Sequence, residues 1–217
     1  MTTSGRKIPA EYENPIDNII LDFVEIMNPF YKELGFTPKI LTTFSLIFAV
    51  LTLFFYVKRK YVLSSIFYLI SYYFDCQDGN FARKYGMETA FGDLYDHLTD
   101  ILSNVSIAYL LLTNKKIGYK YKIAYIIIVS VLLVLAFYHL SCTEIYMEKN
   151  TNYGKKQVLI SLLKKYCKNE TSLNYYKYFA TGTYIMINTV IILLHTLLRW
   201  TATTFSREKS YINTEAV

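Results

Sequence analysis

Four aspartates at fixed spacing are the residues of this chain whose chemistry is easiest to infer. They lie in the segment 75–100, DCQDGNFARKYGMETAFGDLYDHLTD, which contains the pattern D-xx-DG-xx-AR-x8-G-xxx-D-xxx-D. Asp75 and Asp78 are three residues apart, which places them on one face of a helix. Asp96 and Asp100 are four residues apart and share a face in the same way. Two helices joined by a short link can therefore bring all four carboxylates together.

Carboxylates at this density favour hard divalent cations, namely magnesium, manganese or calcium. Two such ions would neutralise the four carboxylates and leave positions open for phosphate oxygens. Gly79 and Gly92 let a ligand approach the backbone closely, and Arg83 supplies a fixed cation for a diphosphate. The expected chemistry is phosphoryl transfer at a metal-bound diphosphate ester, with one carboxylate left to take a proton.

The motif also lies at membrane depth. The apolar run before it, 61–74, has 14 residues, and the run after it, 101–113, has 13. Because a spanning helix needs roughly 20 residues, each run must extend into the acidic segment to cross a bilayer. A carboxylate at a helix centre costs about 2.5 to 3.5 kcal/mol, so four of them need a polar cavity with cations.

The composition predicts an all-α, multipass transmembrane helix bundle. The 217 residues are 53% hydrophobic and 17% aromatic, with only 18% charged. Three further apolar runs, 41–57, 123–140 and 179–198, are each long enough to cross, which gives five clear spans. The short run 158–163 has lysines on both sides and leaves a sixth crossing open.

The first 36 residues are expected to form a polar N-terminus and an amphipathic interfacial helix. Residues 1–12 are polar and are predicted to be loose, whereas 15–27 place apolar side chains at helical spacing opposite acidic ones. Asn28 and Pro29 are expected to end this helix. The transmembrane domain is then assigned to residues 37–200, followed by a polar tail at 201–217.

The net charge of +6 does not indicate nucleic-acid binding, because the basic residues form short clusters that flank apolar runs. Many of the 22 tyrosines lie near the ends of these runs, where amphipathic rings favour the membrane interface. The three cysteines, Cys76, Cys142 and Cys167, have no metal-ligand spacing, and no disulfide framework is expected.

All eight fixed positions of the motif match a known family. They are Asp75, Asp78, Gly79, Ala82, Arg83, Gly92, Asp96 and Asp100. The segment 37–42, TPKILT, is also similar to the family's approach to its first helix, with lysine where asparagine is common. On these residues the chain resembles the CDP-alcohol phosphotransferases, also called CDP-alcohol phosphatidyltransferases.

The resemblance implies a mostly six-helix membrane enzyme that transfers a phospho-alcohol from a CDP-alcohol to a second alcohol and releases CMP. The implied ligands of two divalent cations, Mg²⁺ or alternatively Mn²⁺, are Asp75, Asp78, Asp96 and Asp100. The implied residues of the CDP site are Gly79, Ala82, Arg83 and Gly92. The family also implies that Asp100 is the general base for the incoming hydroxyl.

Because cytidine nucleotides are cytosolic, the resemblance places the motif on the cytosolic side, in an endomembrane such as the endoplasmic reticulum if the cell is eukaryotic. Lys and Arg counts on alternate sides of five spans, 13 against 10, favour this only slightly. The implied partners are a CDP-alcohol donor, an alcohol or lipid acceptor and membrane lipids, and a homodimer stays open.

Several alternatives remain at this point. Asp93 is expected to be a solvated surface carboxylate, and His97 is expected to point away from Asp96 into packing contacts. Within the family, CDP-choline or CDP-ethanolamine with diacylglycerol competes with CDP-diacylglycerol and a polar alcohol such as inositol. Outside the family, a membrane prenyltransferase leaves the glycine and arginine spacing without a role, and a cation transporter predicts ion flux without CMP release.

Overall fold

The computed structural model describes residues 4–115, 117–150, 167 and 172–196. Its regular structure in these ranges is entirely helical, which confirms the predicted all-α class. The helices are α1 (Pro15–Glu33), α2 (Pro38–Val57), α3 (Tyr61–Lys84), α4 (Ala90–Thr113), α5 (Tyr119–Asn150), α7 (Ser172–Tyr176), the short 3₁₀ helix η2 (Lys177–Phe179), and a helix over residues 181–196.

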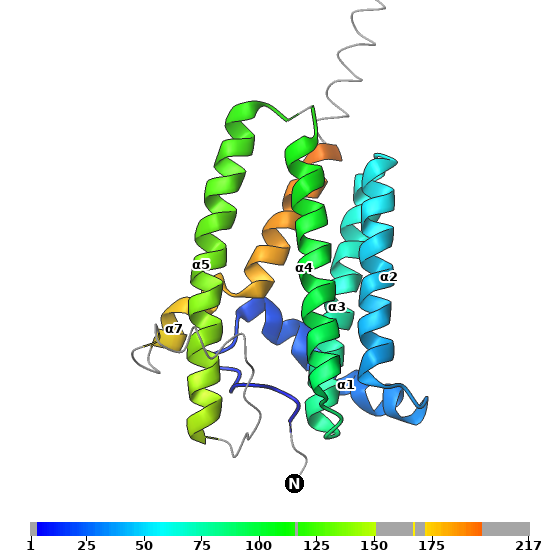
Figure 1. Ribbon diagram of the computed structural model, residues 1–217, viewed down its shortest axis with the longest axis vertical. Coiled ribbons are helices and arrows are strands. Elements are labelled where there is room, and N and C mark those ends of the chain that lie inside the picture. The colour runs from blue at the N-terminus through cyan, green and yellow to red at the C-terminus, as the bar shows by residue number, and fades with distance from the viewer. Residues whose placement is uncertain (1–3, 116, 151–166, 168–171, 197–217) are drawn as a thin grey trace, which may run out of the picture.

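The long helices α2 to α5 run up and down in alternation, and the helix over residues 181–196 runs beside them (Figure 1). The end of α3 and the start of α4 meet at the lower end of the bundle in this view, where α1 and the N-terminal segment also lie. Both halves of the acidic motif therefore sit on helices, joined by residues 85–89.

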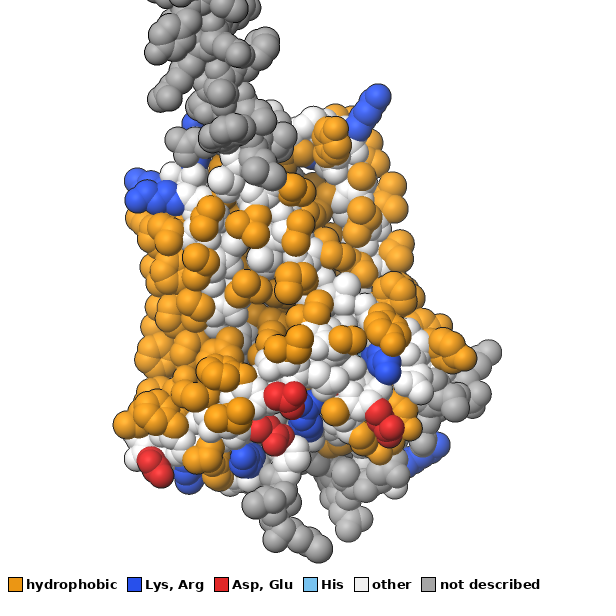
Figure 2. All heavy atoms as spheres, turned by 180° about the vertical axis from the view of Figure 1, so that it is seen from behind, with side chains coloured by type: hydrophobic (Ala, Val, Ile, Leu, Met, Phe, Trp, Pro, Cys, Tyr) orange, Lys and Arg blue, Asp and Glu red, His pale blue; other side chains and the backbone are white. Residues whose placement is uncertain are grey.

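Three described helices are long and apolar enough to cross a membrane: 38–57, 119–147 and 172–196. Helices α3 and α4 have 24 residues each but carry the acidic motif, which lowers their hydropathy. Figure 2 shows hydrophobic side chains over most of the height of one face, with acidic side chains near its lower end. These features support a membrane protein. Five spans stay a prediction, and the run 158–163 lies outside the described residues.

Helix α1 is longer than predicted, because it passes through Pro29 and ends at Glu33. A proline inside a helix leaves the carbonyl four residues earlier without its usual N–H donor, and here that carbonyl belongs to Glu25. Lys84 Nζ, at the end of α3, donates to the Glu25 carbonyl at 3.4 Å. The expectation that Asn28 and Pro29 end the helix was therefore wrong, since another helix supplies the missing donor.

A buried row of amides joins α1 to α3. Asn28 donates from Nδ2 to Asn80 Oδ1 at 2.8 Å and accepts from Gln77 Nε2 at 2.7 Å, and all three side chains are buried. Ile19, Phe23 and other apolar side chains of α1 point outward instead. Because the polar face of α1 is satisfied inside the protein, its apolar face is free to contact lipid.

The segment before α1 packs against the protein and is not loose, contrary to the sequence-based expectation. Asn18 Nδ2 donates to the Ala10 carbonyl at 2.7 Å, and His139 of α5 contacts the Tyr12 carbonyl at 3.2 Å. The rings of Tyr12 and Tyr146 lie 5.7 Å apart. The contacts of Tyr12 with His139 and Tyr146 join residues that are more than a hundred positions apart, which local sequence patterns do not reveal.

Asp17 at the start of α1 is buried where α1, α3 and the last helix meet. It accepts hydrogen bonds from the Tyr72 hydroxyl at 2.5 Å and from the Gly182 N–H at 3.3 Å. A methyl group in place of the Gly182 hydrogen would overlap the Asp17 carboxylate, so only glycine allows this close approach. Burial raises the pKa of Asp17 from its ordinary value of 3.8 to about 7, although the Tyr72 hydrogen bond acts in the opposite direction.

The raised pKa of Asp17 predicts a pH-dependent stability. Between pH 4 and pH 7 the folded protein holds a proton on Asp17 that the unfolded chain has released, so the Asp17 contribution to the free energy of unfolding falls as pH rises through this interval. Asp17→Asn removes this titration. We expect its melting temperature, relative to the unaltered protein, to rise between pH 4.5 and 7 in detergent and then to level off. Parallel melting curves across this interval would contradict the assignment, and Glu33→Gln serves as a control carboxylate.

A disulfide between Cys142 of α5 and Cys167 corrects the expectation that no cysteines pair. The two residues are 25 positions apart in the sequence, and Cys142 is fully buried. The three cysteines show no spacing that marks a pair, whereas the pairing depends on the fold bringing Cys167 beside α5, where its Cα lies 5.2 Å from that of Cys142. Cys76 is a free thiol, as expected.

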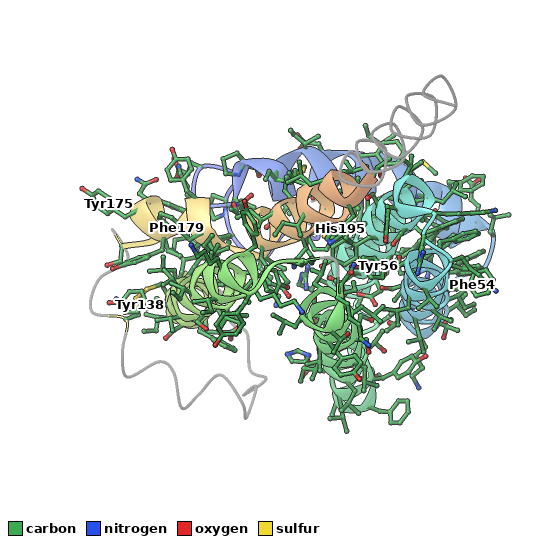
Figure 3. The ribbon with its side chains drawn as sticks, turned by 90° about the horizontal axis from the view of Figure 1, so that it is seen from above. Phe54, Tyr56, Tyr138, Tyr175, Phe179 and His195 are labelled. Carbon is green, nitrogen blue, oxygen red and sulfur yellow. A yellow bond between two sulfur atoms is a disulfide. The ribbon has the colours of Figure 1, made fainter. Side chains whose placement is uncertain are left out.

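The opposite end of the bundle is closed by aromatic side chains. Viewed down the helices, Tyr56 of α2 and His195 of the last helix lie close together (Figure 3), with ring centroids 5.8 Å apart in an edge-on arrangement. The Tyr61 ring lies 5.4 Å from the His195 ring. These contacts fix the last helix against the turn between α2 and α3, far from the acidic motif.

Candidate active site

Three of the four motif aspartates converge between α3 and α4. Asp75, Asp96 and Asp100 each offer a carboxylate oxygen, and these three atoms lie within 4.8 Å of one another. Asp75 comes from α3, and the other two come from successive turns of α4. The pairing that the sequence predicted across two helices is therefore present in the fold.

The chemistry of this group fits a divalent cation. Asp75 Oδ1 and Asp96 Oδ1 are both inaccessible to solvent and have no hydrogen-bond partner among the described residues. An unpartnered buried carboxylate oxygen is costly, and like charges at this separation repel. Hard cations bound by oxygen ligands remove both penalties, so these residues are suited to hold magnesium or manganese.

Asp78 lies one turn farther along α3 and stands slightly apart from the other three carboxylates. Its Oδ2 accepts a hydrogen bond from the Thr42 hydroxyl of α2 at 2.5 Å, and its side chain is buried. The Thr42 hydroxyl oxygen also lies 3.1 Å from the Pro38 carbonyl oxygen of its own helix, so its one proton is shared between the two acceptors. Helix α2 thus orients Asp78, a role of Thr42 that the spacing of acidic residues did not reveal.

A cavity of about 370 Å³ opens beside the carboxylates at the motif end of the bundle. It is lined by residues of the N-terminal segment, α2, α3, the α3–α4 link and α4. They are Lys7, Thr37, Pro38, Lys39, Thr42, Asp78, Gly79, Ala82, Arg83, Met87, Glu88, Thr89, Gly92, Asp93, Asp96 and His97. All four residues of the predicted CDP site are among them, whereas Asp75 and Asp100 lie outside the lining.

Gly79 makes room for the guanidinium of Arg83, one turn later on α3. A Cβ atom at position 79 would lie 3.2 Å from Arg83 Nη1 and 3.6 Å from Nη2. Arg83 Nε donates to the Gly5 carbonyl at 2.7 Å, so the side chain is held at its base. Glycine therefore lets the Arg83 guanidinium lie against its own helix, and Arg83 lines the cavity.

Gly79→Ala should separate stability from activity. Alanine is a better helix former than glycine by about 1 kcal/mol, so the melting temperature should stay the same or rise. The new methyl group displaces the Arg83 guanidinium by a few tenths of an ångström. We expect the catalytic efficiency for a CDP-alcohol to fall by about tenfold, because such shifts weaken charge-assisted hydrogen bonds. Full activity in a variant that melts no lower would show that Gly79 serves only the backbone.

Gly92 has a different role from Gly79. The Thr89 hydroxyl caps α4 by accepting from the Gly92 N–H at 3.0 Å. A Cβ atom at Gly92 would lie 2.9 Å from the same hydroxyl, so a side chain there would disturb the cap. The position of Gly92 thus fixes the start of the helix that carries Asp96 and Asp100.

His97 lines the cavity, although the sequence predicted that it points away from the site. Its Nδ1 lies 2.8 Å from the Asp93 carbonyl oxygen, which can only accept, so Nδ1 carries the proton in the neutral ring. Nε2 then keeps its lone pair. The cavity extends around the first two turns of α4, so a side chain one residue beyond Asp96 still reaches it. Asp93 also lines the cavity.

Sequence reasoning missed two cations at this site, Lys7 and Lys39. The Lys39 ammonium lies 4.8 Å from the centroid of the Phe91 ring, at the start of α4. Lys7 reaches the cavity from the N-terminal segment. Lys39 could have been suspected from its place in the TPKILT segment, but no pattern marks Lys7.

Comparison with known proteins agrees with the geometry. The family model for CDP-alcohol phosphatidyltransferase matches residues 36–207, which is more than half of the chain. This range contains the complete acidic motif and both helices that carry it. A search of curated proteins found no match. By its motif, its helical fold and this match, the chain belongs to the CDP-alcohol phosphatidyltransferase family.

Proposed function

We propose that this protein is an integral-membrane transferase that moves a phospho-alcohol from a CDP-alcohol to an acceptor alcohol and releases CMP. Membership of the family supports transfer of a phospho-alcohol from a CDP-linked donor. The observation that carries the proposal is the convergence of Asp75, Asp96 and Asp100 beside a cavity lined by Gly79 and Arg83.

Two divalent cations, with Mg²⁺ preferred, are proposed to be held by Asp75, Asp78, Asp96 and Asp100. When bound, such ions neutralise the diphosphate and make its phosphorus more electrophilic. Asp78 is already oriented by Thr42, and Asp75 and Asp96 have unpartnered oxygens. The protein therefore needs little rearrangement to accept a metal-bound diphosphate.

The nucleotide is proposed to occupy the cavity against Gly79, Ala82, Arg83 and Gly92. The small side chain of Ala82 and the two glycines leave space near the backbone, and Arg83 is proposed to donate from its terminal nitrogens to the diphosphate. In the reaction, the acceptor oxygen forms a bond to the phosphorus that bears the alcohol, and the bond from that phosphorus to the bridging oxygen breaks. CMP leaves with the electron pair.

The acceptor hydroxyl must lose its proton during this step, and we propose Asp100 as the base. Asp100 belongs to the converging carboxylates, and its own carbonyl is tied to Asn104 Nδ2 at 2.9 Å. His97 is the competing base, because it lines the cavity and its Nε2 keeps a lone pair, whereas Asp100 does not line the cavity. Asp100→Asn should abolish transfer if Asp100 is the base, whereas a dominant effect of His97→Gln on the pH profile would reassign the role.

The experiment that tests the proposal uses the purified protein in detergent. CDP-choline, CDP-ethanolamine and CDP-diacylglycerol are each supplied with diacylglycerol, inositol, serine or glycerol phosphate, and CMP is measured with and without magnesium. Magnesium-dependent CMP from one donor is expected, and the productive pair names the substrates. Ion flux in vesicles without CMP from any donor would favour a transporter and overturn the proposal.

We further propose that the motif end faces the cytosol, where cytidine nucleotides are found. The Cys142–Cys167 disulfide is a reason to measure this topology directly, because disulfides are rare in reducing compartments. A single cysteine introduced in place of Lys32 reports which side of the membrane the start of α2 faces, and one in place of Arg59 reports the same for the end of α2. Labelling of position 32 only from the cytosolic side is expected, and labelling from the lumenal side would reverse the orientation.

A further inference from the structure

The N-terminal segment over residues 4–14 is fixed directly over the end of α3. The Gly5 carbonyl accepts the Arg83 Nε hydrogen bond, and the Arg6 guanidinium donates to Asn18 Oδ1 and to Asp22 Oδ1, each at 2.6 Å. Ile8 is 3% exposed, so the residue after Lys7 is anchored as well. Both neighbours of Lys7 are thus held in place.

The contact between this segment and α3 is too close for any residue but glycine. A Cβ atom at Gly5 would overlap both the side chain and the carbonyl oxygen of Asn80. Asn80 is itself fully buried and is bonded to Asn28 of α1. The segment therefore packs against the buried amide row, and this packing determines the position of Lys7.

Lys7 lines the same cavity as Arg83 and Asp96, and it is half-buried. Its ammonium makes no hydrogen bond or ion pair within the described part of the chain, although it interacts electrostatically with Asp75, Asp96 and Asp100. Arg6, the adjacent cation, is instead paired with Asp22. One of the two neighbouring cations holds the segment, and the other is left for a ligand.

We propose that Lys7 binds the phosphate group that is transferred, so that the N-terminal segment completes the donor site. This inference rests on the proposed function. Four carboxylates match two divalent cations in charge, so the two negative charges of a diphosphate diester need two further cations. Arg83 supplies the first of these. Lys7 supplies the second, because the ammonium of Lys39, the third cation of the lining, is already held over the Phe91 ring.

The position of Lys7 in the cavity indicates which of the two phosphates of the donor it binds. Lys7 acts electrostatically on Asp75, Asp96 and Asp100. The motif carboxylates that act on Arg83 are Asp78 and Asp96, so Lys7 is the cation on the Asp100 side of the site. Because Asp100 is the proposed base for the attacking hydroxyl, the phosphorus under attack lies on this side. Arg83, tied to Gly5 and lying along Gly79, is left with the phosphate that departs as CMP. Lys7 also balances charge that develops on the transferred group during the reaction.

Binding of CDP and of CMP to the full-length protein in detergent with magnesium distinguishes the two phosphates. Lys7→Met keeps the length of the side chain and removes its charge. We expect it to weaken CDP binding by about tenfold to a hundredfold, as for loss of a charge-assisted hydrogen bond, while CMP binding changes by less than about twofold. Lys7→Arg should retain most of the CDP affinity. Lys58→Met, at the far end of α2, is the control, and melting temperatures should match throughout.

A double-mutant cycle tests whether Arg6, which holds the N-terminal segment on α1, acts through Lys7. Arg6→Ala releases the segment and should also lower the CDP affinity, but Arg6→Ala combined with Lys7→Met should be no worse than Lys7→Met alone. Equal weakening of CDP and CMP, no weakening of either, or additive effects in the cycle would overturn the inference while the proposed function stands. If the unaltered protein neither binds CDP nor releases CMP from any donor, the proposed function fails, and the inference fails with it.

Discussion

Replacing Asp96 with asparagine is expected to lower magnesium-dependent CMP release by about a thousandfold, since a metal ion contributes several kcal/mol of charge stabilisation and each 1.4 kcal/mol is a factor of ten. Asp96 is the one carboxylate that belongs to the converging group and also lines the cavity. The same change should stabilise the metal-free protein, because it removes a buried, unpartnered oxygen from a cluster of like charges. A gain of about 1 kcal/mol corresponds to a melting temperature about 2 to 4 °C higher in chelator.

Opposite signs for activity and stability make this prediction specific. Magnesium should raise the melting temperature of the unaltered protein and should have a smaller effect on Asp96→Asn. Glu33→Gln removes one negative charge at the exposed end of α1 and controls for net charge. If Asp96→Asn loses activity and also melts at a lower temperature in chelator, Asp96 has a structural role and the metal assignment is contradicted.

Arg83→Lys is expected to lower the catalytic efficiency for the CDP-alcohol by about a hundredfold, although the charge is kept. An ammonium cannot donate to the Gly5 carbonyl and to a phosphate in the forked geometry of a guanidinium, and each charge-assisted hydrogen bond is worth about 1.5 to 3 kcal/mol. The Michaelis constant for the donor should rise while that for the acceptor stays unchanged.

The matched control for Arg83→Lys is Arg59→Lys, in the turn between α2 and α3 at the opposite end of the bundle. It makes the same chemical change and should leave the kinetics unaltered. Guanidinium added to Arg83→Ala should restore part of the activity if the lost group acts on the substrate. A rise in the Michaelis constant for the acceptor alone would instead place Arg83 in the acceptor site.

Helices that are determined by a single apolar run could be predicted from the sequence. Features that depend on a hydrogen bond from a residue far away in the sequence could not. The motif helices were expected because two runs of 14 and 13 residues are too short to span, and α3 and α4 indeed continue through the motif. The end of α1 was misplaced because the donor that compensates for Pro29 is Lys84. Local propensity contains no information about such a partner.

Spacing predicted most of the site, since residues three or four apart on a helix share a face. It predicted that α3 and α4 would face each other with aspartates, but it did not distinguish Asp78, which Thr42 orients, from the three that converge. Lys7 was missed entirely. Its position depends on a hydrogen bond between Gly5 and Arg83, 78 residues apart, and on the fit of Gly5 to Asn80.

The contact between the first and last helices has a consequence for synthesis of the protein. Asn14 donates to the Lys177 carbonyl at 2.6 Å, and Asp17 receives the Gly182 N–H, across 163 and 165 residues of sequence. A ribosome adds about 5 to 20 residues per second, so these partners are synthesised roughly 10 to 30 s after the start of α1. During translation the contacts of Asn14 and Asp17 therefore form only after the last helix has been made, whereas every residue that lines the cavity, from Lys7 to His97, is synthesised well before it.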